Sequence, residues 1–412
     1  MRPLADAQRE ILAAMEQLPA ISVPLGECLG LALADDVVAS HAVPPFENSA
    51  MDGFAVRAAD VASAPVTLAV LEDLPAGSVA RSVITSGTTI KIMTGAPMPD
   101  GADAVVIVED SESHEDDVVT LLEPALPGDH VRRAGGDIEE GAMVLPAGAR
   151  LNPMHLGLLA SVGVGSPVVV KRPTVAVFST GDELAPIDAP ALRPGTIHDS
   201  NRPMLIGALT ELGVDVLDLG IVPDDVRLLR SVLGEAASNA DAVVTSGGVS
   251  MGEYDLVKEA LTEVGQVEFW KVAMQPAKPF AFGFLGCTPL FGLPGNPVSV
   301  MVAFEQFVRP ALLRRMGATR LFRRRTTAVL STPITSSPEK TVFVRVRAEP
   351  GSSGVKVIPF GRQGSNILSA LAAADAFAVV PPGVGDVAAG ATVEVEWFRS
   401  PEARTRQEVL GG

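Results

Sequence analysis

The sequence lacks the features that mark secreted proteins, cysteine-ligated metalloproteins and membrane proteins. Its 412 residues include 2 cysteines, Cys28 and Cys287, which lie far apart in the chain. Two such cysteines make neither a disulfide framework nor a cysteine metal site, so we expect a reducing, cytoplasmic location. No apolar run reaches the length of a membrane span, and the first residues lack the apolar core of a signal peptide.

Positive charge is also scarce. The chain carries 32 Lys and Arg against 49 Asp and Glu, a formal net charge of −17. This balance argues against nucleic acid or an anionic membrane as a partner. An anionic ligand would have to bind where the few cations are concentrated. The 5 histidines include no pair at the spacing that binds a metal from one helix.

What is present is a chain long enough for two to four domains. Residues 4–18 carry apolar side chains at helical spacing, and Asn152-Pro153 has the residues of a helix N-cap and first turn, starting a helix over 153–161. We expect the acidic run 109–117 to be a solvated loop. Short β-type runs indicate a β-rich module, and they lie at 66–71, 89–93, 104–108 and 118–122.

From residue 172 onward, buried strands alternate with helices, which is typical of a doubly wound parallel sheet. Ligands of such sheets bind beyond the carboxyl ends of the strands. We expect strands at 174–179, 214–219, 241–245 and 289–293, and a helix from about residue 202 to residue 212 that Gly213 stops. Polar or glycine-rich segments follow the strands: TGDE (180–183), PDD (223–225), SGGVSMGEYD (246–255) and LPGNPVS (293–299). Their convergence predicts a binding site at that edge of the sheet.

The Ser-Gly-Gly turn is the strongest single signal in this region. Gly247 and Gly248 leave room for an anion to approach backbone N–H groups, and Ser246 and Ser250 add hydroxyls. The carboxylate of Asp255 would repel a phosphate unless a metal ion lay between them. A glycine-rich connection with a solvated acidic edge remains the alternative.

Three other segments contain candidate binding groups. In the segment 269–283, Lys278 lies between two prolines, and we expect this lysine to be held on a stiff loop near the same edge. A helix is expected over 297–315, with its N-terminus available to an anion. Gly53 is expected to adopt a backbone conformation closed to other residues and to aim Asp52 outward, although Asp-Gly is also an ordinary turn pair.

The last part of the chain is again β-type. Residues 319–325 are basic and read as a linker. Because Arg345 and Arg347 alternate along one strand, we expect them to share a solvated face. The runs predict a small β-barrel or sandwich, and they lie at 326–330, 341–347, 355–359, 376–380 and 392–398.

Eight motifs occur in one order along nearly the whole chain: NSAMDGFAV, IMTGAPMP, an Arg-rich GGDI segment, FSTGDEL, SGGVSMGEYD, KPFAFG, GLPGNPVS and GRQGS. In this ordered set the chain resembles the molybdopterin molybdenumtransferase family, called MoeA in bacteria and the gephyrin E domain in animals. The resemblance implies an α/β multidomain fold and an elongated homodimer. The implied domains are a split N-terminal helical domain (1–40 and 137–170), an inserted β-rich module (41–136), a central doubly wound α/β/α domain (171–318) and a C-terminal β-barrel-like domain (319–412).

The resemblance also implies an activity. The family cleaves adenylylated molybdopterin, inserts molybdate into its dithiolene and releases AMP, with Mg²⁺ or a similar divalent ion. Transient contacts with the adenylyltransferase and with apo-molybdoenzymes are implied as well. The active site would lie between the α/β domain of one subunit and the β-module of the other.

The implied site residues fall into three groups. The catalytic carboxylates are Asp52, Asp137, Glu183, Asp224 and Asp255. Asp52 and Asp137 would come from the partner subunit, and the other three would hold the metal. Substrate binding is implied for Thr94, Ser246, Gly247, Gly248, Ser250, Lys278, Pro294, Pro297, Ser299, Arg345 and Ser365. Molybdate is a dianion and needs cations and hydrogen-bond donors, which Lys278, Ser299, Arg345 and Ser365 could supply.

Two residues depart from the family pattern. Gln275 stands where many members carry the first lysine of Lys-Pro-Gly-Lys-Pro, and Asn366 stands where His commonly follows Gln-Gly-Ser. We expect an altered oxyanion preference from these changes. Two alternative functions remain open: a molybdopterin carrier or scaffold without catalysis, and a molybdopterin adenylyltransferase, which would need only the α/β domain.

Overall fold

The structure is a computed structural model that describes residues 1–114, 117–247, 260, 263, 265–349 and 355–399. The chain divides into two compact units. Unit 1 comprises residues 1–21, 30–34 and 169–412, and unit 2 comprises residues 22–29 and 35–168. Short strands lie where the chain passes from one unit to the other, β1 (Ala20–Ser22) and β12 (Val168–Val170). The four-domain division expected from the sequence stays a prediction.

Unit 1 is built on a sheet in which β16, β13, β17 and β21 run parallel, which confirms the doubly wound arrangement. β20 and β18 extend it as antiparallel strands. Because the four parallel strands end at one edge, the segments that follow them converge there. In sheet order the strands are β16 (Asp215–Val222), β13 (Thr174–Thr180), β17 (Ala242–Ser246), β21 (Thr288–Leu293), β20 (Pro279–Leu285) and β18 (Gln266–Lys271).

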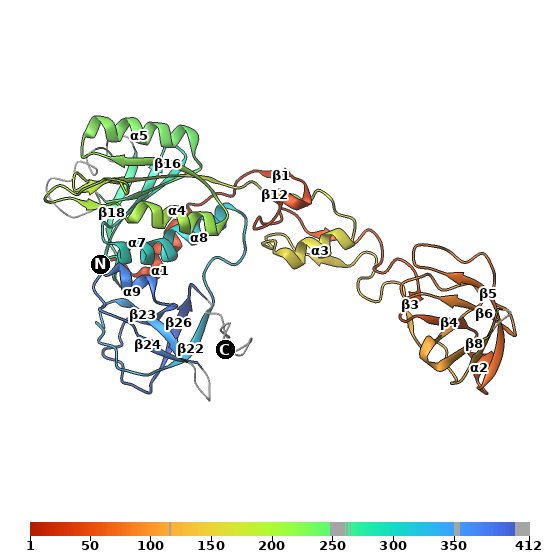
Figure 1. Ribbon diagram of the computed structural model, residues 1–412. Helices are drawn as coiled ribbons and strands as arrows, with labels where there is room; N and C mark the ends of the chain where they lie inside the picture. Colours follow the sequence, from red (N-terminus) through yellow and green to blue (C-terminus); the bar gives the residue numbers. More distant parts are fainter. Residues whose placement is uncertain (115–116, 248–259, 261–262, 264, 350–354, 400–412) are drawn as a thin grey trace. The chain divides into compact units, whose positions relative to one another are not determined.

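Helices cover both faces of this sheet (Figure 1). α5 (Val226–Asn239) packs on one face through Leu229 and Leu233. The other face carries α4 (Asn201–Leu212), which ends at Gly213 as predicted, and a helical run near the C-terminal end of the sheet. That run consists of α7 (Pro297–Ala303), η3 (Phe304–Val308) and α8 (Arg309–Arg315).

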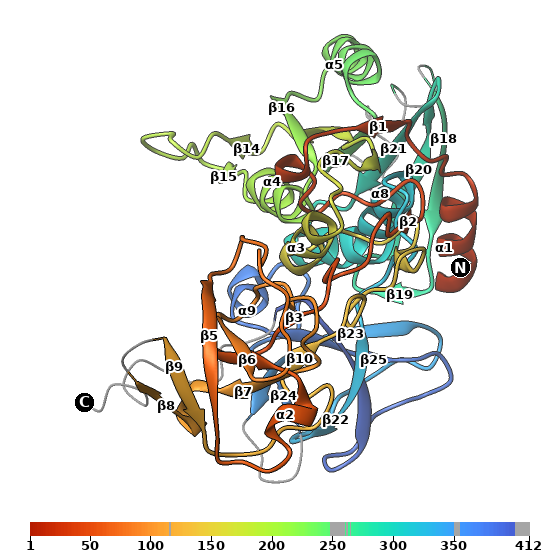
Figure 2. The ribbon, with the colours of Figure 1, turned by 90° about the vertical axis from the view of Figure 1, so that its right-hand side faces the viewer.

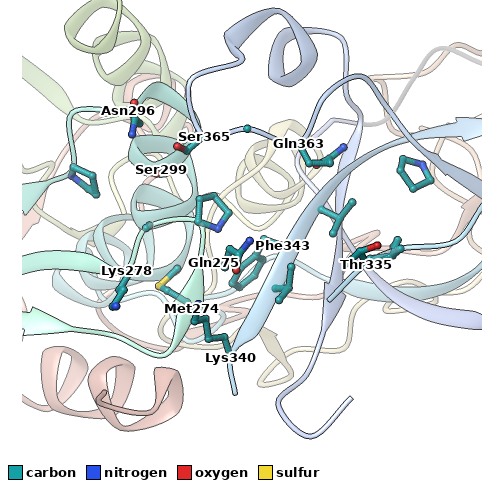
Figure 3. A pocket seen from close by; sticks show the side chains of 18 of the residues that line it. Met274, Gln275, Lys278, Asn296, Ser299, Thr335, Lys340, Phe343, Gln363 and Ser365 are labelled. Carbon is teal, nitrogen blue, oxygen red and sulfur yellow. The ribbon is translucent and has the colours of Figure 1, made fainter. Parts of the chain in front are cut away.

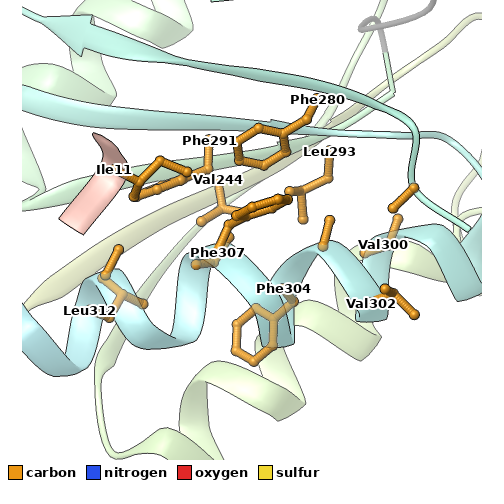
Figure 4. Packing of buried hydrophobic residues seen from close by; sticks show 14 of the residues in the cluster. Ile11, Val244, Phe280, Phe291, Leu293, Val300, Val302, Phe304, Phe307 and Leu312 are labelled. Atoms are coloured by element: carbon orange, nitrogen blue, oxygen red, sulfur yellow. The ribbon is translucent and has the colours of Figure 1, made fainter. Parts of the chain in front are cut away.

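The core on this second face is aromatic. Figure 4 shows Phe280 of the sheet against Phe307 of the helical run, and their ring centroids lie 4.4 Å apart. α1 (Leu4–Ala13) packs into the same core through Ile11. The sequence assigned residues 1–40 to the split domain, whereas residues 1–21 belong to unit 1.

The helical run contains a π-helical turn at η3. Pro310 lies two residues after this turn, and proline has no N–H to donate to the carbonyl four residues earlier. That carbonyl belongs to Gln306, and it accepts a hydrogen bond from Nε2 of Gln8 instead, at 3.3 Å. The widened turn thus has a local cause in the sequence, and it turns the buried Glu305 and Gln306 into the interior.

The C-terminal strands close into a small barrel. β23 pairs with both β24 and β25, so the order β23-β24-β22-β26-β25 returns to β23. β19 (Met274–Gln275) joins β23 in parallel from the α/β part. The barrel strands match the predicted runs: β22 (Arg325–Leu330), β23 (Thr341–Glu349), β24 (Lys356–Pro359), β25 (Ala376–Val380) and β26 (Thr392–Trp397). The remaining elements of unit 1 are α9 (Leu368–Ala372), β14 (Leu184–Ala185) and β15 (Ile197–His198).

Unit 2 contains a sheet in the order β7-β4-β6-β5-β9-β8 (Figure 2). The four predicted strands are confirmed as β5 (Val66–Leu74), β6 (Thr88–Ile92), β7 (Ala104–Ile107) and β9 (Val118–Leu121). The other elements are η1 (Leu25–Glu27), β2 (Val37–Val38), β3 (Asn48–Ser49), β4 (Gly53–Val56), α2 (Ala58–Val61), η2 (Val108–Asp110), β8 (Ser111–His114), β10 (Val131–Arg132), β11 (Met143–Leu145) and α3 (Pro153–Ser161).

One of the local expectations was wrong and two were confirmed. Part of the acidic run is not a loop but the edge strand β8, because backbone pairing with β9 leaves its polar side chains in water. Lys278 lies on the short connection between β19 and β20, as expected. Asn152 caps α3 as predicted, through a hydrogen bond from the His155 N–H.

Gly53 is required for a reason other than the expected one. Its backbone is not left-handed. Instead, a Cβ at this position would lie 2.0 Å from the carbonyl oxygen of Val106 on the neighbouring strand β7. Close packing of β4 on β7 therefore excludes a side chain. Among the described residues, no helix is long and apolar enough to cross a membrane.

Candidate functional site

A cavity of about 610 Å³ lies within unit 1, between the end of the α/β sheet and the barrel. Figure 3 shows its wall, with Lys278 on one side and Gln363 on another. Four predicted site residues line the cavity: Lys278, Pro294, Ser299 and Ser365. Gln275, which departs from the family pattern, lines it too. The cavity thus gathers segments that are remote in the sequence.

The chemistry of the lining is that of an anion site. Among the described residues, the lining includes two lysines, Lys278 and Lys340, and no carboxylate, in a chain with a net charge of −17. Hydroxyls and amides supply further hydrogen-bonding groups. Four polar lining residues were not among the predicted site residues: Asn296, Thr335, Lys340 and Gln363. Only the pairing of β19 with β23 brings Lys340 to this wall, and no local pattern signals that pairing.

Arg345 differs from its expected position. Its side chain is 1% exposed, so the expectation of a solvated face is wrong for this residue, although Arg347 is exposed. Its terminal nitrogens donate to the carbonyls of Arg362 at 2.6 Å and Gly364 at 3.0 Å. Burial lowers the pKa of this guanidinium. Arg345 does not line the cavity, and it shapes the loop that does.

That loop reaches the helical run. The side chain of Gln363 bonds the backbone of Arg345 in both directions, through its Oε1 at 3.0 Å and its Nε2 at 3.2 Å. The carbonyl of Ser365 then accepts from the Val298 N–H of α7 at 3.0 Å. The sequence predicted that the N–H groups in the first turn of this helix could bind an anion. One of them, that of Val298, donates to the Ser365 carbonyl instead. Pro297 begins α7 but does not line the cavity, and the exposed Asn366 does not either.

A second cluster of polar groups lies at the ends of the parallel strands. The Thr180 hydroxyl donates to Oδ1 of Asp224 at 2.8 Å, and the Asp224 N–H donates to Oδ1 of Asp182 at 3.2 Å. Glu183 follows directly and is exposed. The ends of β13 and β16 therefore bring three carboxylates to one edge, as the strand pattern predicted.

Gly247 sits among the same strand ends. Its φ is +95°, and a Cβ there would lie 2.3 Å from the Thr180 carbonyl oxygen, so glycine is required for the close approach of two strands. The preceding Ser246 is buried and accepts a hydrogen bond from Nδ2 of Asn201 at 2.8 Å. The same amide nitrogen donates to the Gly295 carbonyl at 2.6 Å. Asn201, which sequence reasoning missed, therefore ties two of the converging segments together.

Three predicted residues lie outside the described part of the chain: Gly248, Ser250 and Asp255. Among the residues that the structure describes, no group of three or more His, Cys, Asp or Glu side chains is arranged to hold a metal ion. The donors present at the strand ends are carboxylate and hydroxyl oxygens, which are the ligands that Mg²⁺ accepts. Their chemistry fits a divalent ion, with Glu183 and Asp224 as the described members of the predicted set.

In unit 2, Asp52 and Thr94 form a defined pair. Oδ1 of Asp52 accepts from both the N–H and the hydroxyl of Thr94, each at 2.7 Å. The backbone hydrogen bond from Thr94, followed by its hydroxyl, lowers the pKa of Asp52, so this exposed carboxylate stays charged in mildly acidic solution.

Asp137 is not part of that pair. Residues 43–50 run antiparallel to residues 130–138, and the Asp137 N–H donates to the Val43 carbonyl at 3.0 Å. Asp137 thus lies at one end of the paired segments, while Asp52 lies beyond the other end. The structure does not bring these two carboxylates together within one chain.

Three protein families match the chain in order. Residues 2–163 match the MoeA N-terminal region (domain I and II), residues 176–314 match a probable molybdopterin binding domain, and residues 327–398 match the MoeA C-terminal region (domain IV). The matches cover both units.

Whole-chain relatives agree with these regions. The chain is 41% identical over 405 residues to molybdopterin molybdenumtransferase 2 of Mycobacterium tuberculosis, covering 96% of this chain and 99% of the relative. It is 38% identical to molybdopterin molybdenumtransferase of Haemophilus influenzae, covering 93% and 96%. A crystal structure of the molybdopterin biosynthesis MoeA protein of Pyrococcus horikoshii is similar in fold, with a TM-score of 0.80, 33% identity and coverage of 97% and 99%.

Proposed function

The chain belongs to the MoeA family, and from this premise we propose how its residues divide the work of the reaction. It is a molybdopterin molybdenumtransferase that inserts molybdenum during molybdenum cofactor biosynthesis. The observation that carries the assignment is the match to both MoeA regions and to the molybdopterin binding domain between them, together with relatives that align over nearly the whole chain. The reaction in detail and the roles of single residues are our proposal.

Molybdate binds in the cavity of unit 1 in this proposal. A tetrahedral dianion needs positive charge and several donors, and the wall offers Lys278 together with the hydroxyls of Ser299 and Ser365. The absence of carboxylates from this wall lowers the electrostatic cost of placing an anion in an acidic protein. Arg345 contributes indirectly, because it holds the loop that presents Ser365.

The phosphoanhydride of adenylylated molybdopterin would lie at the strand ends. There Ser246 and the Gly247 turn would receive phosphate oxygens, and cleavage would release AMP. Mg²⁺, when bound by Glu183, Asp224 and Asp255, would neutralise charge on the phosphates. Thr180 orients the Asp224 carboxylate through its 2.8 Å hydrogen bond. We propose a cytoplasmic location, which the free Cys28 and Cys287 support.

We further propose a homodimer in which Asp52 and Asp137 complete the site of the partner subunit. Unit 2 offers apolar surface for an interface: Met154 of α3 is 72% exposed, and Met143 of β11 is 63% exposed. Only Leu159 of α3 is buried among the described residues. A helix with so little of its apolar surface covered favours association with a second protein surface.

The alternatives are less well supported. An adenylyltransferase would need only the α/β domain, whereas the MoeA N-terminal and C-terminal regions also match this chain. A carrier without catalysis would have no need for Asp52 and Asp224, and both make defined hydrogen bonds to threonine. These contacts favour the transferase.

Reconstitution tests the proposal. Purified protein, adenylylated molybdopterin, molybdate and Mg²⁺ would be mixed with a molybdenum-free apoenzyme, and AMP release and apoenzyme activation would be recorded. We expect both signals from the native chain and neither from Asp224→Asn. Asp215→Asn, at the opposite end of β16, is the matched control and should retain both. Binding of the pterin without either signal would identify a carrier instead.

A further inference from the structure

The barrel contributes a cation to the cavity that no sequence motif identified. We propose that Lys340 is the second cation of this cavity, acting with Lys278 to bind the oxyanion and to set its affinity. The inference rests on the proposed function, because it assigns a further binding residue to the same cavity. Lys278 and Lys340 are its lysines, and they approach from different parts of the fold.

The backbone of Lys340 is held on both sides. Its N–H donates to the Ser337 carbonyl at 3.2 Å, and the next N–H, that of Thr341, donates to the Ala273 carbonyl at 3.0 Å. The parallel pairing of β19 with β23 places Met274 opposite Thr341. Lys340 is therefore fixed beside the β19 wall, and Figure 3 shows its side chain near Met274.

The charge of Lys340 has no carboxylate partner in the described part of the chain. The lysine ion pairs found there are Lys91–Asp73 and Lys171–Asp241. The adjacent Glu339 lines a separate cavity beside α1. Lys340 is a half-buried residue with no counter-ion among the described residues, and the described lining of its cavity contains no carboxylate, which fits an anionic ligand better than a structural role.

The two lysines reach the cavity from two different elements. Lys278 lies on the connection between β19 and β20, and Lys340 precedes the barrel strand β23. Gln275 also lines the cavity, and its amide is neutral. The positive charge on the barrel side of this cavity therefore rests on Lys340.

Isothermal titration calorimetry of the full-length chain with sodium molybdate tests the inference by measuring the dissociation constant. Loss of one charge-assisted contact should weaken binding about 10- to 100-fold in Lys340→Gln. Lys340→Arg keeps the charge and should lose much less. Lys356→Gln is the matched control, because this exposed lysine of β24 does not line the cavity and its loss changes the net charge equally.

Moving the charge gives a second test. Because β19 and β23 are adjacent, Gln275→Lys combined with Lys340→Gln should recover most of the affinity lost by Lys340→Gln alone. Gln275→Lys alone adds a third cation and should tighten binding of molybdate and tungstate. Identical molybdate curves for the native chain and Lys340→Gln would overturn the inference.

The outcomes separate this inference from the proposed function. If the native chain binds molybdate and Lys278→Gln weakens binding while Lys340→Gln does not, only the role of Lys340 is overturned. If the native chain binds no molybdate, the assignment of the cavity fails, and the role of Lys340 fails with it. Sulfate in place of molybdate measures how far the two lysines select for the larger anion.

Discussion

At the scale of single residues, hydrogen bonds set the charge state of one carboxylate, and packing holds backbone strain at one residue of the cavity wall. Asp52 shows the first effect. Two hydrogen bonds from Thr94 stabilise its ionised form, and the backbone bond is the larger cause of its lowered pKa. A group held ionised in this way carries its charge over a wider pH range, which suits a residue that handles a metal or a phosphate.

Replacement of the threonine should shift this titration. In Thr94→Val the hydroxyl bond is lost and the backbone bond remains, so the pKa of Asp52 should rise but stay below its ordinary value. Carbon-detected NMR of the Asp52 carboxyl measures the shift. Thr94→Ser keeps the hydroxyl and should titrate like the native chain. Superimposable curves for Thr94→Val and the native chain would contradict the assigned cause.

Ala277 shows the second effect. Its φ of +71° lies in the left-handed region, where the Cβ of a residue other than glycine is crowded. The position corresponds to the glycine of the family's Lys-Pro-Gly-Lys-Pro pattern. Ala277 is buried in the wall of the cavity, so this strain is held next to Lys278 by the surrounding packing.

Ala277→Gly should relieve that strain. Against the loss of one small buried methyl group, we expect the free energy of unfolding of unit 1 to rise by up to about 1 kcal/mol. Urea unfolding followed by tryptophan fluorescence reports unit 1, because Trp270 and Trp397 are the 2 tryptophans of the chain. Ala311→Gly in α8 is the opposite control and should lower stability by about 1 kcal/mol or more. A lower stability for Ala277→Gly would show that the methyl group matters more than the strain.

At the scale of elements, the π-helical turn connects the α/β part of unit 1 to the barrel. Nε2 of Gln306 donates to Oε1 of Glu396 on β26 at 2.7 Å, and Arg325 of β22 bonds the other carboxylate oxygen at 3.1 Å. Beside it, Glu305 accepts two hydrogen bonds from Arg323, both at 2.8 Å. Buried polar groups with such partners favour one packing arrangement of the two layers that enclose the cavity.

Glu396 predicts a pH dependence of stability. Burial raises the pKa of this carboxyl, and the Arg325 charge offsets that only in part. The Glu396 carboxyl therefore keeps its proton to higher pH in the folded state than in the unfolded state. Its contribution to stability is present below about pH 4.3 and falls as the pH rises through the raised pKa. Glu396→Gln removes this titration and should flatten the stability profile in that interval, as measured by urea unfolding at a series of pH values. An unchanged slope would argue that other carboxyls dominate.

At the scale of the whole molecule, the division into two units bears on how the active site is completed. Asp52 and Thr94 belong to unit 2, whereas Glu183, Asp224 and the cavity belong to unit 1. If the active site is shared between subunits, as we propose, each site consists of unit 1 of one chain and unit 2 of the other. An intact site can then form from two chains that are each mutated in a different unit. A mixture of two variant chains can therefore test whether the dimer shares its active sites.

Complementation should follow from that arrangement. Asp52→Ala and Asp224→Ala chains, each inactive alone, should regain about a quarter of the native activity when they are refolded together, because random pairing leaves half of the dimers with one intact site. Asp52→Ala mixed with Asp137→Ala is the control and should stay inactive, since both changes lie in unit 2. Failure of the first mixture to regain activity, with dimers present, would place the whole site in one chain.

Most strands and helices of the described chain, and the family, could be predicted from the sequence alone. Alternating strands and helices predicted the parallel sheet and its ligand-binding edge, and glycine and asparagine marked the helix ends at Gly213 and Asn152. These features depend on side-chain periodicity and on backbone preferences, which are local properties that a linear pattern records. The ordered motifs then indicated the family that the comparisons show.

Only the tertiary structure decided which remote residues share a surface. Arg345 is buried because a loop 17 to 19 residues later covers it with its carbonyls, as the bonds to Arg362 and Gly364 at 2.6 and 3.0 Å show. Lys340 reaches the cavity because β23 pairs with β19, and edge strand β8 exists because β9 lies beside it. Strand pairing and loop closure join segments far apart in the chain, and no local pattern encodes which partner each segment meets.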